Sequence, residues 1–227
     1  NSLYEGCLMK SVVFDLDGTL ADTSKDLIAA ANSCFEQLGL TIMLDPINDA
    51  SVAFRGGRAM LRLGLERANC LDESIIDEQY SFLLKHYEKN INVETFLYDG
   101  VCDALNELQK RGYLLGVCTN KPEFLAEKLL KSLGIREYFL ALLGADTLSV
   151  RKPNPMHLWT TIDRMGGDRK KAILIGDTIT DSDTAKNANL PCILVSFGPK
   201  GSEVKNMKAS ALLNTYFDLP DLIDTIL

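Results

Sequence analysis

Two aspartates lie two positions apart in the segment FDLDGTLADT at residues 14–23, directly after an apolar run. Side chains spaced by two along an extended strand project to the same side, so Asp15 and Asp17 can act on one group. Uncompensated carboxylates at the end of a buried strand are costly, which argues against a simple charged turn. Gly18 follows them and allows the chain to turn sharply. The pair is therefore a candidate functional site.

Further polar residues follow later apolar runs of the chain. Thr119 and Asn120 end the run LLGVCT, and Asp177 and Asp181 follow the run AILIG at residues 172–176. In open α/β sheets the ligand crevice lies beyond the carboxyl ends of the strands. If the first strand and the AILIG strand are neighbours, up to four carboxylates converge on one crevice.

A cluster of carboxylates repels itself or keeps protons unless a cation neutralises it. Hard oxygen ligands that leave room for water and a phosphate group are typical of Mg²⁺. Lys152 adds a positive charge from the segment VRKPNP, in which Pro153 and Pro155 stiffen the loop. The sequence therefore predicts a magnesium site with a lysine beside it.

The elements that carry these residues have two different patterns. From residue 19 to about residue 91 the signals are helical, and Thr23 with Asp26 is typical of a capping box. Elsewhere apolar strands alternate with helices, which indicates a parallel sheet covered on both faces. The expected strands are 10–16, 114–119, 139–144, 172–176 and 192–196, and the expected later helices are 101–108, 122–134, 155–165, 182–188 and 218–226. The fold class is α/β, with a doubly wound parallel sheet and an all-helical insert.

Composition limits the function classes. The chain has 227 residues, is 46% hydrophobic and carries a net charge of -7, which argues against a nucleic-acid or membrane surface. Its apolar runs are shorter than the roughly 20 residues of a membrane span. The six cysteines show no C-x-x-C spacing, and several lie in apolar segments, which favours a reducing, cytoplasmic compartment. Met9 is a candidate native start, with residues 1–8 as a leader or remnant.

The four motifs together resemble the haloacid dehalogenase superfamily. DxDGT, a later Thr-Asn, a Lys-Pro and a Gly-Asp-Thr-x-x-x-Asp occur in that order and spacing, and the resemblance extends from about residue 10 to the end. It implies a catalytic core formed by residues 1–18 and 95–227, with residues 19–94 as a helical cap. It also implies an enzyme that uses Mg²⁺.

The resemblance implies a role for each motif residue. Asp15 is expected to take the phosphoryl group as an aspartyl-phosphate, and Asp17 to act as general acid and then as base. Thr119 is expected to bind the phosphoryl oxygens, and Lys152 to balance their charge. Asn120 orients either the phosphate or its own loop. A metal ion makes the approach of a carboxylate to a phosphate dianion feasible, since both are negatively charged.

The resemblance also implies the metal ligands. Asp15, the backbone carbonyl of Asp17, and Asp177 are expected to hold Mg²⁺. Asp181 is expected to be a ligand or to act through water, and it can also cap the helix that follows it. Asp22 is interpreted as a hinge or helix-start residue.

The substrate class follows from the details of the motifs. The second aspartate favours phosphate esters, and the helical insert resembles the cap of the phosphoglycolate phosphatase and β-phosphoglucomutase branch. The segments VCTNKP, GADTLSVRKPNP and ILIGDT resemble phosphoglycolate phosphatase, whereas AFRGGRAML and FGPKG depart from it. The expected substrate is a small phosphorylated metabolite, with 2-phosphoglycolate as the best guess. A sugar-phosphate mutase, a pyrophosphatase, a nucleotidase and a non-catalytic binding module stay open, as does the choice between monomer and homodimer.

Several other residues have two interpretations. Arg55 precedes two glycines and could bind a substrate carboxylate, or it is a surface arginine, with Arg58 a weaker candidate. Gly18 is the other candidate substrate contact. Lys121 is interpreted as a solvated loop charge. His86 and His157 lie in expected helices without a partner pattern and are interpreted as structural.

Overall fold

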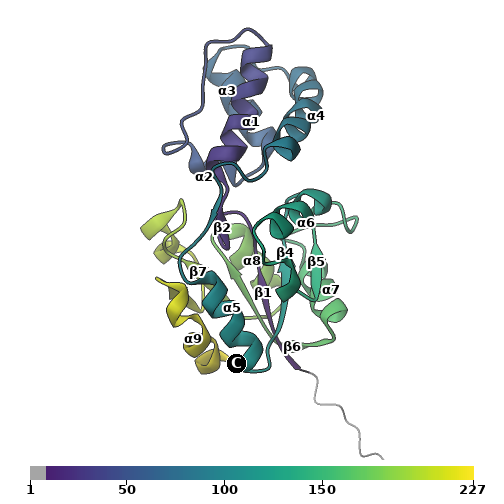
Figure 1. Ribbon diagram of the computed structural model, residues 1–227, viewed down its shortest axis with the longest axis vertical. Helices are drawn as coiled ribbons and strands as arrows, with labels where there is room; N and C mark the ends of the chain where they lie inside the picture. The colour runs from purple at the N-terminus through teal and green to yellow at the C-terminus, as the bar shows by residue number, and fades with distance from the viewer. Residues whose placement is uncertain (1–8) are drawn as a thin grey trace, which may run out of the picture. The chain divides into compact units, whose positions relative to one another are not determined.

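The computed structural model describes residues 9–227, so the expected leader and Cys7 lie outside the described part. The chain divides into two compact units (Figure 1). One unit contains the chain up to Leu20 together with Tyr98–Leu227, and the other contains Ala21–Leu97. No helix in the described residues is both long enough and apolar enough to cross a membrane.

The first unit is built on a parallel sheet of six strands in the order β5-β4-β1-β6-β7-β8. Strand β1 lies in its middle and pairs with β4 on one side and β6 on the other (Figure 1). This confirms that the first strand and the AILIG strand are neighbours. The strands are β1 (Met9–Phe14), β4 (Leu114–Cys118), β5 (Ala141–Leu143), β6 (Gly167–Gly176), β7 (Cys192–Val195) and β8 (Ala211–Leu213).

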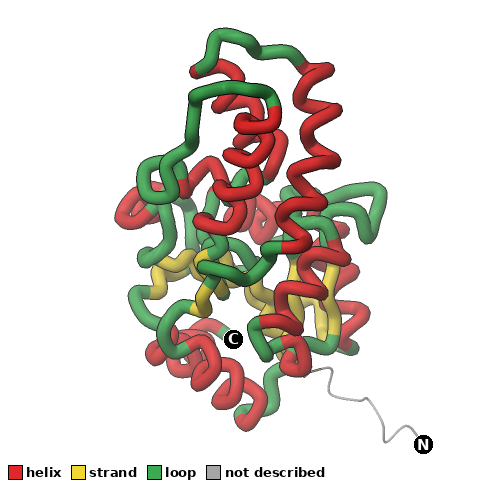
Figure 2. The backbone as a smooth tube through the Cα atoms, turned by 45° about the horizontal axis from the view of Figure 1, so that its top comes forward, coloured by secondary structure: helices red, strands yellow, loops and turns green. Residues whose placement is uncertain are grey.

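Helices cover both faces of this sheet, as the doubly wound prediction requires (Figures 1 and 2). Helices α7 (Pro155–Met165) and α8 (Ile179–Asn187) contact each other and pack against β6, while α5 (Val101–Lys110) contacts α9 (Leu219–Ile226). Helix α6 (Glu123–Ser132) packs beside β5. Val13 belongs to an apolar cluster that also contains residues of α7. Val12 and Phe14 are fully buried too, and their side chains point to the opposite face of the sheet because successive strand residues alternate. Both faces of the strand are therefore buried, which is why its sequence is apolar throughout.

Local signals in the sequence determine where the helices begin and end. Helix α7 begins at Pro155 because the Asn154 side chain accepts a hydrogen bond from the Met156 N–H, and it ends at Gly166, whose φ is +76°. Helix α8 begins at Ile179, earlier than expected, because Thr178 and Asp181 form a capping box. This capping brings Asp181 into the first turn of α8, next to the end of β6.

The second unit is helical, with a short antiparallel pair where the chain enters and leaves it. Its helices are α1 (Ser24–Gln37), α2 (Ala50–Ala53), α3 (Gly57–Arg67) and α4 (Glu73–Lys89), and its strands are β2 (Ala21–Asp22) and β3 (Phe96–Leu97). The capping box expected of Thr23 and Asp26 was wrong. The Asp26 carboxylate instead accepts the backbone N–H groups of Val93, Glu94 and Thr95, at 2.9–3.1 Å, and so joins the two connecting segments.

Close packing of α1 on α3 depends on Gly64. A Cβ added at Gly64 would lie 2.0 Å from the ring of Phe35, which is fully buried. We expect Gly64→Ala to lower the free energy of unfolding of the helical unit by about 1–3 kcal/mol, because the ring must move. Chemical denaturation measures this loss. Phe35→Leu makes room for the added methyl group. The double variant Gly64→Ala and Phe35→Leu should therefore lose less unfolding free energy than the two single variants lose in total, and equal losses would contradict the packing argument.

Candidate active site

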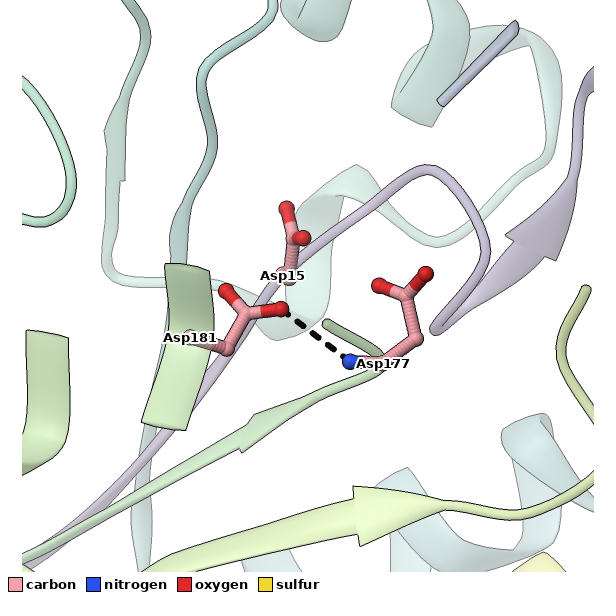
Figure 3. Close-up of side chains that lie close together, drawn as sticks. All are labelled: Asp15, Asp177 and Asp181. Carbon is pink, nitrogen blue, oxygen red and sulfur yellow. Dashed lines mark hydrogen bonds between the residues drawn. The ribbon is translucent and has the colours of Figure 1, made fainter. Parts of the chain in front are cut away.

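Three aspartates from different elements meet at the carboxyl end of the sheet (Figure 3). Asp15 follows β1, Asp177 follows β6, and Asp181 lies in the first turn of α8. Oxygen atoms of the three carboxylates lie within 4.8 Å of one another. The parallel register pairs Phe14 with Ile175, which places the residues after both strands side by side.

The Asp181 carboxylate both caps α8 and belongs to this cluster. One oxygen, Oδ2, accepts the Asp177 N–H at 3.0 Å, as the dashed line in Figure 3 shows. The other oxygen, Oδ1, accepts a hydrogen bond from Lys152 Nζ at 2.7 Å. Gly176 makes this arrangement possible, since an added Cβ would lie 2.3 Å from the Asp181 carboxylate. Of the two interpretations of Asp181, the structure shows the helix cap, while a role toward a metal ion stays a prediction.

Lys152 is the positive charge at the centre of the cluster. Its Nζ lies 2.7 Å from Asp181 and 3.2 Å from Asp15, and its side chain is only 2% exposed. The Asn120 amide holds the backbone of this lysine on both sides, donating to the Lys152 carbonyl and accepting its N–H, each at 3.1 Å. Of the two interpretations of Asn120, the structure shows contacts that orient the loop.

Burial and mutual repulsion shift the pKa values of these groups in the metal-free chain. Burial, followed by the negative charge of Asp181, raises the pKa of Asp15 to about 7. Burial and then the charges of Asp15 and Asp181 raise the pKa of Asp177 well above its ordinary value. Burial alone would lower the pKa of Lys152, but Asp15 and Asp181 outweigh it and raise that pKa above its usual range. Without a metal ion, the carboxyl groups of Asp15 and Asp177 therefore tend to keep their protons, because Lys152 alone does not offset three ionised carboxylates.

Asp177 shows that a divalent cation fits this cluster. Its Oδ1 accepts a hydrogen bond from the Thr19 hydroxyl at 2.9 Å. Its Oδ2 is buried and has no hydrogen-bond partner among the described residues. A buried carboxylate oxygen without a partner is costly, and a hard cation bound there, with Asp15 beside it, would satisfy it. The donor set is entirely oxygen, which suits Mg²⁺.

Asp17 pairs with a lysine that the sequence analysis placed in solvent. Lys121 Nζ donates to Asp17 Oδ1 at 2.7 Å, and the lysine side chain is only 4% exposed. The interpretation of Lys121 as a solvated loop charge was therefore wrong. Its partner lies 104 positions away in the chain, so no local pattern could indicate the contact.

Thr119 is buried in the same loop. It is 1% exposed, its N–H donates to the Leu143 carbonyl at 3.0 Å, and its hydroxyl oxygen accepts the Lys121 N–H at 3.1 Å. The end of β4 thus holds this hydroxyl in one place, beside the lysine that contacts Asp17.

The turn after Asp17 is held by residues that sequence reasoning missed. Gly18 has a φ of +78°, a conformation that side chains disfavour. The Tyr216 hydroxyl donates to the Thr19 carbonyl at 2.5 Å, while the Thr19 side chain reaches Asp177. An added Cβ on Gly198 would lie 3.0 Å from the Gly18 carbonyl oxygen. The FGPKG segment, which departs from the expected pattern, therefore packs against the turn that follows Asp17.

The candidate residues of the helical unit differ in their contacts. Arg55 is exposed, and its guanidinium makes no ion pair or hydrogen bond within residues 9–227. Arg58 pairs with Asp77 and lies over the ring of Tyr80, with its guanidinium carbon 4.6 Å from the ring centroid. Of the two arginines, Arg58 is therefore the one that neighbouring residues of its own unit hold in place.

His157 has the structural role that we expected of it. It is fully buried, and its Nε2–H donates to the Gly144 carbonyl at 2.8 Å. Its Nδ1 lies 3.4 Å from Cys118 Sγ. Cys34, Cys70, Cys102, Cys118 and Cys192 are free thiols.

Comparison with known proteins agrees with this geometry. The sequence profile of haloacid dehalogenase-like hydrolases matches residues 12–195. A phosphoglycolate phosphatase from Mesorhizobium japonicum is 39% identical over 208 residues, which is 91% of each chain. One from Agrobacterium fabrum is 38% identical over 188 residues, covering 82% of this chain and 80% of the relative.

Solved structures show the same fold. A predicted phosphoglycolate phosphatase from Haemophilus somnus superposes with a TM-score of 0.84 at 23% identity, over 94% of this chain and 97% of that one. CbbY from Rhodobacter sphaeroides, solved with xylulose-1,5-bisphosphate, gives a TM-score of 0.75 at 21% identity, over 93% and 96% of the two chains. With the profile match over most of its length and these relatives, the chain belongs to the haloacid dehalogenase-like hydrolase family.

Proposed function

We propose that the protein is a Mg²⁺-dependent phosphatase of small phosphomonoesters that works through an aspartyl-phosphate at Asp15. The observation that carries this proposal is the buried group of Asp15, Asp177 and Asp181 around Lys152, in which one Asp177 oxygen has no hydrogen bond to any described residue. Asp15, Asp177 and the Asp17 carbonyl would hold the ion, with Asp181 acting through water because its own oxygens bind Lys152 and backbone N–H groups. Bound Mg²⁺ supplies positive charge that lets a carboxylate approach a phosphate dianion.

The reaction proceeds in two displacements. In the first, an Asp15 oxygen forms a bond to phosphorus while the bond from phosphorus to the alcohol oxygen breaks, and Asp17 gives its proton to that oxygen. In the second, Asp17 takes a proton from water, the water oxygen attacks phosphorus, and Asp15 leaves as a carboxylate. One residue thus serves as acid and then as base.

The neighbouring residues bind the phosphoryl group and keep the loops in place. Lys152 offsets the charge of Asp15 and of the phosphoryl oxygens, which are negative throughout the transfer. The Thr119 hydroxyl donates to one of these oxygens. Asn120 acts through Lys152, since its amide holds that residue's backbone.

We propose 2-phosphoglycolate as the substrate, since relatives up to 39% identical over 91% of the chain bear the name phosphoglycolate phosphatase. Phosphate release is measured from 2-phosphoglycolate, sugar phosphates, nucleotides and pyrophosphate, with Mg²⁺ and with a chelator. We expect turnover that requires Mg²⁺ and is fastest on 2-phosphoglycolate. Faster turnover of another ester would identify that ester, and not 2-phosphoglycolate, as the substrate. Transfer of label between two positions of a sugar phosphate would indicate a mutase. Absence of turnover on every ester would contradict the proposal.

We further propose that the helical unit acts as a cap and that Arg55 binds the substrate carboxylate. Support comes from its exposed, unpaired guanidinium, which suits a planar carboxylate. Arg55→Ala is expected to raise KM for 2-phosphoglycolate by about 10- to 100-fold, as for the loss of a charge-assisted hydrogen bond. KM for ethyl phosphate, which has no carboxylate, should stay within about twofold. Arg58→Ala is the matched control, and equal effects of the two variants would contradict the role of Arg55.

A further inference from the structure

Asp17 and Lys121 lie in the loops that follow two neighbouring strands of the sheet. Asp17 follows β1, Lys121 follows β4, and the parallel register pairs Phe14 with Val117. The two side chains therefore meet directly above the carboxyl ends of these strands, with Nζ 2.7 Å from Oδ1. Lys121 thus contacts Asp17, the residue that transfers the proton in the proposed reaction, from the loop after a different strand.

The backbone of Lys121 is fixed on both sides. Its N–H donates to the Thr119 hydroxyl oxygen at 3.1 Å, and its carbonyl accepts the Ala145 N–H at 2.8 Å. Gly144 packs so closely that an added Cβ would lie 2.7 Å from this carbonyl. The ammonium group is therefore presented to Asp17 by a loop that is locked before substrate arrives, which is the property expected of a preorganised site.

Stability alone gives little reason for this pair. The lysine side chain is 4% exposed and the aspartate side chain 14%, so both lose most of their hydration. The attraction within a buried ion pair often does no more than offset that cost, and an apolar pair of similar size is often as stable. A buried pair in which one member is the expected proton donor therefore indicates a role in the reaction.

We propose that Lys121 is a positioning residue that holds the Asp17 carboxyl group in line with the oxygen of the leaving alcohol. This inference rests on the proposed phosphatase function. Lys121 binds Oδ1 and so fixes the rotation of the carboxyl group about its last bond. Proton transfer requires a heavy-atom distance of about 2.6–3.2 Å, which a carboxyl group that is free to rotate satisfies for only part of the time.

The leaving group gives a readout that a structural role would not change. A poor leaving group such as ethanol must receive a proton as its bond to phosphorus breaks, whereas 4-nitrophenol leaves as a stable anion. Loss of positioning should therefore slow alkyl esters much more than 4-nitrophenyl phosphate. The kcat/KM value isolates this step, because it includes only events up to the first phosphoryl transfer. Esters without a carboxylate exclude any contribution from substrate carboxylate binding.

The experiment compares Lys121→Met with the wild type on 4-nitrophenyl, phenyl and ethyl phosphate in the presence of Mg²⁺. We expect kcat/KM to fall by about 100-fold on ethyl phosphate and by less than about fivefold on 4-nitrophenyl phosphate, with phenyl phosphate between them. Lys121→Gln keeps a hydrogen-bond donor without the charge, so its losses should follow the same order but be smaller. Lys131→Met, on the exposed face of α6, is the control for losing a lysine.

Equal losses on the three esters would overturn the inference, since they would indicate a role in phosphate binding or in folding. No loss on any ester would overturn it as well. If Lys121→Met fails to fold, the loss of kcat/KM on ethyl phosphate is compared with the loss on 4-nitrophenyl phosphate in Lys121→Gln instead. Failure of the proposed function is distinguishable, because the wild type would then hydrolyse none of the esters.

Discussion

Asp15→Asn is expected to lower kcat for every phosphomonoester by at least about 1,000-fold, because the amide cannot take the phosphoryl group. The effect should be independent of the leaving group, since the bond to phosphorus never forms at this residue. The loss of turnover should also not be accompanied by a comparable loss of substrate binding. Asparagine keeps the shape of the side chain and its contact with the Leu16 N–H, so substrate binding should change far less than turnover. Phosphate release and equilibrium binding of substrate measure the two effects.

The fold of this variant should be intact. Asp15 lies among carboxylates, and its replacement removes repulsion with Asp181, so thermal unfolding should begin at no lower temperature than in the wild type. Asp183→Asn, an exposed residue of α8, is the control for removing one charge from this region. A variant that kept more than a tenth of wild-type turnover would rule out Asp15 as the nucleophile.

Lys152→Met is expected to lower kcat/KM by at least about 100-fold and also to destabilise the core. The activity falls because the positive charge beside Asp15 and the phosphoryl oxygens is lost. The stability falls because Asp181 and Asp15 lose their buried partner, and breaking a buried ion pair costs about 3–5 kcal/mol. Steady-state kinetics and chemical denaturation of the metal-free protein measure the two losses.

A second substitution separates these losses. In the double variant Lys152→Met and Asp181→Asn, a neutral amide replaces the carboxylate that has lost its ammonium partner. The amide oxygen can still accept the Asp177 N–H. Most of the stability should return while activity stays low. Recovery of activity together with stability would show that Lys152 serves the fold alone, contrary to the proposal.

The sequence was sufficient to predict five of the six strands and the meeting of Asp15, Asp177 and Asp181 after them, because both depend on short local patterns. Buried parallel strands are apolar on both faces, so β1, β4, β6 and β7 were recognisable without their partners. Helix α7 was predicted with both of its ends, since Asn154, Pro155 and Gly166 carry the signals for start and stop. Strand β8 was missed because its three residues are too short to show a pattern.

Contacts between distant segments could not be predicted in the same way. Lys121 looked like an ordinary loop charge because its partner comes from another strand, and only the register of β1 against β4 brings them together. Asp26 looked like a capping residue until the backbone at residues 93–95, more than 60 positions away, occupied its carboxylate. Thr19 carried a signal in the DGT motif, but its contact with Asp177 spans 158 positions.

The most direct test of the central claim is to identify the residue that carries the phosphoryl group during turnover. The enzyme is mixed with Mg²⁺ and substrate, quenched within the first turnover, and treated with borohydride, which reduces an acyl phosphate but not a free carboxylate. Mass spectrometry of the peptide between Lys10 and Lys25 then locates the reduced residue. We predict reduction at Asp15, dependent on both Mg²⁺ and substrate. Reduction at another residue, or none while the enzyme turns over, would contradict the mechanism.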